Sequence, residues 1–173
     1  MLLCVGALLF SQAGQSDGFP EYEVKAALLF KIARFVEWPA SSFDPALPEL
    51  RLCVIGEDPF GAALDSLAGK QVQGRAVRIL RARQPGEHAA ECHIAFLNEP
   101  NEKRLRAWLR ALDGAPVLTV GDVDGFSHNG GTVNLLIRDR RVKFEVNVTA
   151  SELAGLKISA QLLQLATIVG TRS

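Results

Sequence analysis

Short apolar runs of strand length alternate with amphipathic helices along this chain of 173 residues, and that alternation limits its possible folds. The predicted strands cover residues 50–55, 72–80, 93–97 and 117–120, and a hairpin follows at 132–137 and 142–148. The predicted helices cover residues 22–36, 58–67, 101–112 and 159–169. Such an order indicates one sheet with helices packed on both of its faces.

The predicted fold class is therefore α/β, with one layered α/β/α domain over residues 22–170. We expect a mixed sheet whose parallel strands follow a 2-1-3-4-like order, as in flavodoxin-like folds, where the first and third strands are neighbours. The antiparallel hairpin then extends that sheet. A chain of 173 residues is long enough for one domain with a substantial core and too short for two comfortable ones.

The net charge of the chain argues against strongly anionic binding partners. The sequence has 19 basic and 19 acidic residues, so its formal net charge is zero. Binding to nucleic acid or to an anionic membrane normally depends on an excess of basic residues. We expect neither partner.

The N-terminus predicts export. Residues 2–10 form an apolar run that is too short to span a bilayer, and small residues suited to signal cleavage follow it. No Lys or Arg precedes the run, so the basic region of the signal is missing or lies upstream of the first Met. We expect residues 1–13 to be a signal peptide and 14–21 a flexible lead, with a buried N-terminal helix as the alternative.

The cysteines agree with an oxidising compartment. Cleavage of the signal removes Cys4 and leaves Cys53 and Cys92, an even number suited to one disulfide. In the predicted strand order Cys53 lies in the first strand and Cys92 just before its neighbour, so a bridge is geometrically reasonable. We predict no metal site, because Cys92, His93 and His88 lack a recognised ligand spacing.

The sequence shows no pattern that indicates catalysis. No Ser or Cys lies in a nucleophile elbow, no phosphate loop occurs, and the calcium-loop pattern that starts at Asp122 fails at Phe126. An enzyme of the hydrolase or transferase type is therefore the least favoured function. We expect no catalytic residue and no cofactor.

Three residues are candidates for binding a small anionic ligand. Ser159 suits the N-cap of the last predicted helix, and Lys157 beside it would add a positive charge at that helix N-terminus. Glu57 follows the first strand, at the end of the sheet where open α/β folds bind ligands. The alternative interpretation is a solvated lysine, an ordinary cap and a tight turn.

Three other residues are candidates for contact with a protein partner, namely Trp38, Arg75 and Phe126. Trp38 follows the first predicted helix, and an exposed Trp at a helix end is a common anchor in protein interfaces. Aromatic residues in such a cluster are more often part of the core, and that alternative stays open.

Several short motifs occur in an order that is more specific than any one of them. They are Phe35-Val36-Glu37-Trp38-Pro39, Gly56-Glu57-Asp58-Pro59-Phe60-Gly61, Cys92-His93-Ile94, Leu118-Thr119-Val120-Gly121-Asp122, Gly130-Gly131, Phe144-Glu145-Val146-Asn147 and Leu156-Lys157-Ile158-Ser159. This ordered set resembles the YfiR-like family from about residue 22 to residue 169.

The resemblance implies a non-enzymatic periplasmic repressor, typically a homodimer. Such a protein binds the periplasmic sensor domain of an inner-membrane diguanylate cyclase and lowers the cyclic-di-GMP signal that controls biofilm formation. An outer-membrane lipoprotein sequesters it. The pair Cys53 and Cys92 resembles a disulfide of such proteins, whereas a second disulfide of some members has no cysteines in region 127–135 here. From the residues alone, a periplasmic sensor of small anions is the alternative function.

Overall fold

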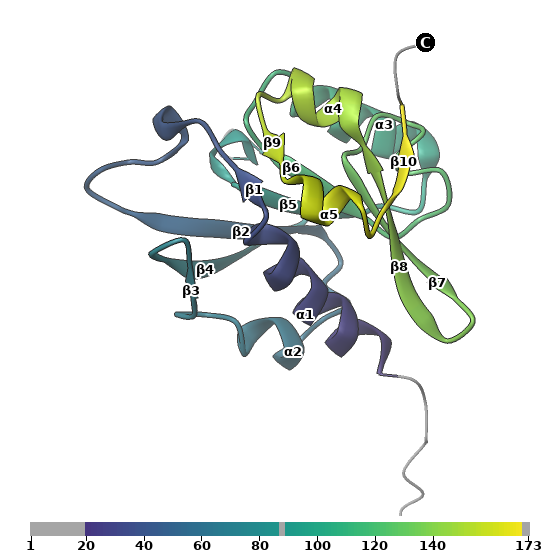
Figure 1. Ribbon diagram of the computed structural model, residues 1–173, viewed down its shortest axis with the longest axis horizontal. Helices are drawn as coiled ribbons and strands as arrows, with labels where there is room; N and C mark the ends of the chain where they lie inside the picture. The colour runs from purple at the N-terminus through teal and green to yellow at the C-terminus, as the bar shows by residue number, and fades with distance from the viewer. Residues whose placement is uncertain (1–19, 87–88, 171–173) are drawn as a thin grey trace, which may run out of the picture.

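The computed structural model describes residues 20–86 and 89–170, so the predicted signal peptide and most of the predicted lead lie outside the described residues. An eight-stranded mixed sheet forms the centre, in the order β10-β8-β7-β6-β5-β2-β4-β3 (Figure 1). Its strands are β2 (Glu49–Gly56), β3 (Gln71–Val72), β4 (Arg75–Ala82), β5 (Ile94–Asn98), β6 (Leu118–Gly121), β7 (Val133–Arg138), β8 (Arg141–Asn147) and β10 (Thr167–Val169). A second, two-stranded sheet pairs β1 (Val36–Glu37) with β9 (Lys157–Ile158).

The predicted strand order is confirmed. Strands β4, β2, β5 and β6 are parallel neighbours in that order, which is the predicted 2-1-3-4 arrangement. Strand β7 continues the parallel set beside β6, and β8 returns antiparallel to β7 as the predicted hairpin. The predicted second strand is divided in two, because Gln73 and Gly74 adopt positive φ angles of 49° and 76° and turn the chain between β3 and β4.

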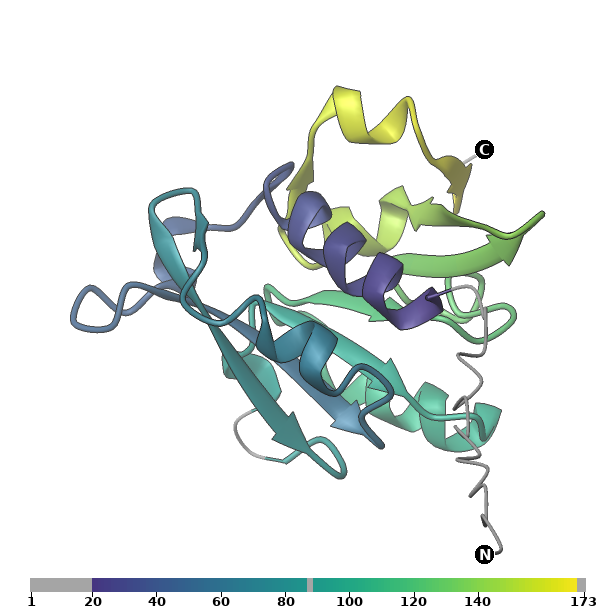
Figure 2. The ribbon, with the colours of Figure 1, turned by 90° about the horizontal axis from the view of Figure 1, so that it is seen from below.

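Helices cover both faces of the sheet, which confirms the layered arrangement (Figures 1 and 2). The helices are α1 (Glu21–Ala33), α2 (Ala62–Asp65), α3 (Glu102–Ala111), α4 (Val148–Leu153) and α5 (Ala160–Leu163), with short 3-10 turns at Ala40–Ser42 and Ala89–Glu91. One core contains residues of α1, α2 and α5, whereas the core on the opposite face contains Leu105 of α3 and the cysteine pair.

The buried face of α1 differs from the predicted one. The helical spacing of Val24, Leu28 and Ile32 predicts that these residues face inward. Ile32 is buried, but Val24 is 36% exposed and the neighbouring Lys25 is only 2% exposed. Lys25 is buried because its ammonium group pairs with Asp122, 2.7 Å away at the end of β6, and with Glu21 on its own helix. A paired lysine can therefore occupy a core position.

The last predicted helix is also corrected. Helix α5 spans only Ala160–Leu163, and Thr167–Val169 form strand β10, parallel to β8 at the edge of the sheet. The three residues of β10 are β-branched, which favours a strand where a neighbouring strand has an unpaired edge. Among residues 20–86 and 89–170 no helix combines the length and the apolar character that a bilayer crossing requires.

Candidate functional site

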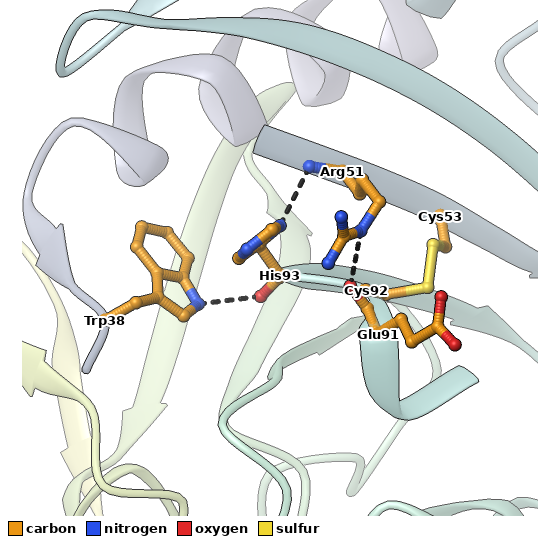
Figure 3. Close-up of a disulfide and its surroundings, with 6 residues drawn as sticks. All are labelled: Trp38, Arg51, Cys53, Glu91, Cys92 and His93. Carbon is orange, nitrogen blue, oxygen red and sulfur yellow. Dashed lines mark hydrogen bonds between the residues drawn. A yellow bond between two sulfur atoms is a disulfide. The ribbon is translucent and has the colours of Figure 1, made fainter. Parts of the chain in front are cut away.

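A disulfide joins Cys53 of β2 to Cys92, just ahead of β5, as the sequence predicted (Figure 3). The two Cα atoms lie 6.0 Å apart, within the usual range for such bridges. Both cysteines are almost fully buried, in the core on the α3 side of the sheet. The bridge therefore holds the segment before β5 against the middle of β2.

His93, next to the bridge, strengthens the same junction. Its Nδ1 accepts a hydrogen bond from the backbone N–H of Arg51 at 2.9 Å, and its own backbone N–H donates to the Arg51 carbonyl at 2.9 Å. The Arg51 side chain in turn donates to the Glu91 carbonyl at 2.7 Å, as Figure 3 shows. Because Nδ1 is an acceptor, the neutral ring carries its proton on Nε2, which lies 3.0 Å from the Ser42 carbonyl oxygen.

Burial determines the protonation of His93. The residue is 1% exposed, and this loss of solvent is the main reason that the pKa of His93 falls from 6.5 to about 4. The positive charges of Arg51 and Arg75 lower the pKa further, whereas the bond to the Ser42 carbonyl opposes the shift. His93 is therefore a neutral, structural imidazole at neutral pH.

Aromatic rings connect this buried junction to the surface. The His93 ring stacks on Phe43 with centroids 4.3 Å apart, and the Arg75 guanidinium lies 3.7 Å from the centroid of the Phe43 ring. Trp38 meets His93 edge to face and donates from Nε1 to its carbonyl at 2.9 Å. We call Trp38, Phe43, Arg75 and His93 the aromatic stack. Phe43 and Arg75 are its half-buried members, so they are the ones that solvent or a partner can reach.

The structure places the other two predicted partner contacts in the interior. Trp38 is 8% exposed and Phe126 is fully buried, so neither side chain offers a contact surface in this conformation. The Phe126 ring lies between Gly121 and Gly131, where an added Cβ would come within 2.3 Å and 2.0 Å of it. The glycine-rich connection after β6 thus makes room for one aromatic ring of the core.

The predicted ligand-binding residues lie on different elements, with Lys157 and Ser159 at β9 and the start of α5 and Glu57 after β2. Ser159 caps the four-residue helix α5 by accepting from the Leu162 N–H at 3.3 Å, and Lys157 is exposed opposite Glu37 in the small sheet. Glu57 is exposed at the end of β2. None of these three residues lines either of the two cavities described for residues 20–86 and 89–170. Their ligand role stays a prediction.

The switch point of the sheet lies between the carboxyl ends of β2 and β5, where the two backbones approach closely. A Cβ on Gly56 would lie 2.2 Å from the Asn98 carbonyl oxygen, and the Asn98 side chain donates to the Glu57 carbonyl at 2.7 Å. Open α/β sheets usually bind ligands in this crevice. Here Gly56 and Asn98, at the ends of these two strands, are in close backbone contact.

A buried ionic cluster next to this edge was missed by the sequence analysis. Besides its bond to Lys25, Asp122 accepts from the Tyr22 hydroxyl at 3.1 Å, and the Lys25 ammonium lies 4.6 Å from the Tyr22 ring centroid. Burial, followed by the negative charge of Asp122, raises the pKa of Tyr22 to about 12. The cluster fixes α1 to the end of β6. No group of three or more potential metal ligands occurs in the part of the chain that the structure describes.

Comparison with protein-family models decides the relationship, since the YfiR/HmsC-like model matches residues 22–167. The chain belongs to the YfiR/HmsC-like family. The match covers every described strand except the last residues of β10, and it includes the aromatic stack and the disulfide.

Family membership gives the general function. Members of the YfiR/HmsC-like family are periplasmic regulators of diguanylate cyclases and not enzymes. A disulfide between two buried cysteines agrees with that compartment, because such bridges persist where the environment is oxidising.

Proposed function

We propose that this chain binds the periplasmic sensor domain of an inner-membrane diguanylate cyclase and represses its synthesis of cyclic-di-GMP. The observation that supports this function is the match of residues 22–167 to a family of such regulators. Repression requires tighter binding to the inhibited form of the cyclase than to its active form. A tenfold preference corresponds to about 1.4 kcal/mol of differential binding free energy.

The half-buried part of the aromatic stack is the surface that we propose for this contact. Arg75 lies over Phe43, and His93 supports Phe43 from beneath. An arginine stacked on an aromatic ring suits a binding hot spot, because arginine and aromatic side chains are enriched at such sites. The disulfide and the Arg51–His93 bonds hold that support in place.

Deletion of the gene in its own host tests the repression. Cellular cyclic-di-GMP is expected to rise after deletion and to return when the wild-type gene is restored. An unchanged level, in a strain where immunoblotting detects the exported protein before deletion, would show that the chain does not repress a cyclase.

Substitution of Arg75 tests the contact surface. Arg75→Ala is expected to weaken binding to the purified sensor domain by about tenfold, the effect of losing a moderate hot spot. Arg83→Ala is the matched control, because Arg83 is an exposed arginine that directly follows the same strand. Equal affinities of the two variants, with unchanged thermal midpoints, would remove Arg75 from the interface.

We also propose that the protein is exported by the signal peptide at residues 1–13, acts as a homodimer and is sequestered by an outer-membrane lipoprotein. Cell fractionation, light scattering of the purified protein and co-purification from detergent extracts test these statements separately. The dimer and the lipoprotein contact can each fail without affecting the repression itself, whereas repression through a periplasmic domain requires export.

A further inference from the structure

A cavity of about 560 Å³ lies on the α3 side of the sheet, away from the aromatic stack. It is lined by the end of α3, the start of β6, the Asn129-Gly130 turn, α4 and Gly170. Figure 1 shows α3 and α4, which contribute lining residues, near each other at the upper right. The volume falls within the range of roughly 300 to 1,000 Å³ that is typical of pockets for small ligands.

The cavity has a largely apolar wall. Two of its residues, Leu112 and Val117, are buried, whereas Leu153 is 63% exposed and leaves one side open to solvent. The apolar lining residues are Leu109, Leu112, Val117, Ala150, Leu153 and Ala154. A ligand with an apolar body would therefore remove hydrocarbon surface from water on entering.

Two buried threonines give the cavity a polar group that is not fully used. Thr119 and Thr132 both line it and are 7% and 2% exposed. Their Oγ1 atoms lie 3.1 Å apart, and Thr119 Oγ1 also accepts the Thr132 backbone N–H at 2.9 Å. Each hydroxyl has one proton to donate, and the bond between them uses only one. The second proton has no acceptor among the described residues, so a ligand oxygen in the cavity can accept it.

The rim of the cavity has an arginine available for an anion. Arg106 is already bonded to Glu102 and, at 3.3 Å, to Asn129. Arg110 lines the same rim, is exposed, and forms no ion pair with any residue of 20–86 and 89–170. Asp113 also lines the rim, and with Glu102, the ion-pair partner of Arg106, it balances the two arginines in formal charge. Arg110 is thus the arginine of this rim that is open to an anion.

We propose that this cavity binds a small organic anion with an apolar body. Its hydrocarbon part lies against the apolar wall, one oxygen accepts the free threonine proton, and its charged group pairs with Arg110. This site is separate from the aromatic stack, so it goes beyond the proposed function and does not depend on it. It also differs from the predicted anion site at Lys157, which lines neither described cavity.

A pair of fluorescent probes that differ in charge tests the proposal. The first is 8-anilinonaphthalene-1-sulfonate, and the second is N-phenyl-1-naphthylamine, which has the same ring system without the sulfonate. The folded wild-type protein is expected to bind both at one saturable site. In the wild-type ¹⁵N spectrum, the first probe is expected to shift the amide signals of Gly114, Asn129, Gly130 and Thr132, which line the cavity.

Two variants locate the binding. Arg110→Gln is expected to raise the Kd of the sulfonate probe about fivefold, as for a partly exposed ion pair, and to leave the Kd of the neutral probe within twofold. Lys103→Gln is the matched control, since it removes one exposed positive charge from the same helix but does not line the cavity. Ala150→Phe fills the cavity and is expected to abolish binding of both probes.

The proposal is wrong if neither probe binds saturably to the folded wild-type protein. It is equally wrong if the shifted amides lie away from the cavity, a result that needs no variant to fold. Equal effects of Arg110→Gln and Lys103→Gln on the sulfonate probe would reject the role of Arg110. Persistent binding to a folded Ala150→Phe variant would reject the cavity as the site.

Discussion

Burial of His93 predicts that acid destabilises the protein in a defined pH range. The imidazole is neutral in the folded state, where its pKa is about 4, but it takes up a proton near pH 6.5 once the chain unfolds. Between these two values the unfolded state binds more protons than the folded state, so the free energy of unfolding falls as the pH falls. The stabilisation is complete above about pH 6.5 and is lost progressively toward pH 4.

The two pKa values give the size of the effect. A complete shift of one pKa unit corresponds to 1.36 kcal/mol, so titration from pH 7.5 to pH 4.5 is expected to cost about 2.5 kcal/mol. That is a large part of the roughly 5 to 15 kcal/mol by which a typical domain is stable. Urea unfolding at a series of pH values, followed by Trp fluorescence, measures this loss directly.

Two variants distinguish the contribution of His93 to the pH dependence of stability from the contributions of other titrating groups. His93→Asn keeps an acceptor for the Arg51 N–H but cannot be protonated, so it is less stable at pH 7.5 and loses about 2.5 kcal/mol less on acidification. His128→Asn is the control, because His128 is exposed, and it is expected to keep the pH dependence of the wild type. The same pH dependence in His93→Asn and the wild type would refute the reasoning.

Three further predictions concern stability. Replacing both Cys53 and Cys92 by Ala is expected to lower the free energy of unfolding by about 4 kcal/mol, since the bridge joins residues 39 apart; a urea midpoint equal to that of the oxidised wild type would contradict this. Asp122→Asn leaves the buried Lys25 ammonium without its more buried negative partner and is expected to lower the free energy of unfolding by about 3 kcal/mol, measured by the same assay. The double variant with Lys25→Met should recover part of this loss. Gly131→Ala would place a methyl carbon 2.0 Å from a buried aromatic ring and is expected to cost about 3 kcal/mol; an unchanged thermal midpoint would show that the ring can move aside.

The strand order and the disulfide could be predicted because their signals are local or follow from general rules of topology. Apolar runs bounded by Gly, Pro and polar residues located the strands, and the parallel arrangement then made the first and third strands neighbours. That arrangement brought Cys53 near Cys92.

The outward or inward position of single side chains was harder to predict. Trp38 and Phe126 were considered for partner contact, yet both are buried. Whether an aromatic ring is exposed depends on what packs over it, and for Phe126 this includes two glycines that flank it in the folded chain. A glycine-rich connection around one aromatic residue, as in the segment from Gly121 to Gly131, is a sequence signal for such packing.

The sequence by itself determined the class of fold, the order of the strands, the cysteine pair and the family, since each depends on residue patterns along the chain. Only the tertiary structure decided which side chains meet. Lys25 is buried because Asp122, 97 residues away, neutralises it. The cavity exists because residues of α3, α4 and Gly170 lie around Thr119 and Thr132. Such contacts join residues far apart in the chain, and their energies depend on distance and burial, which a linear pattern does not contain.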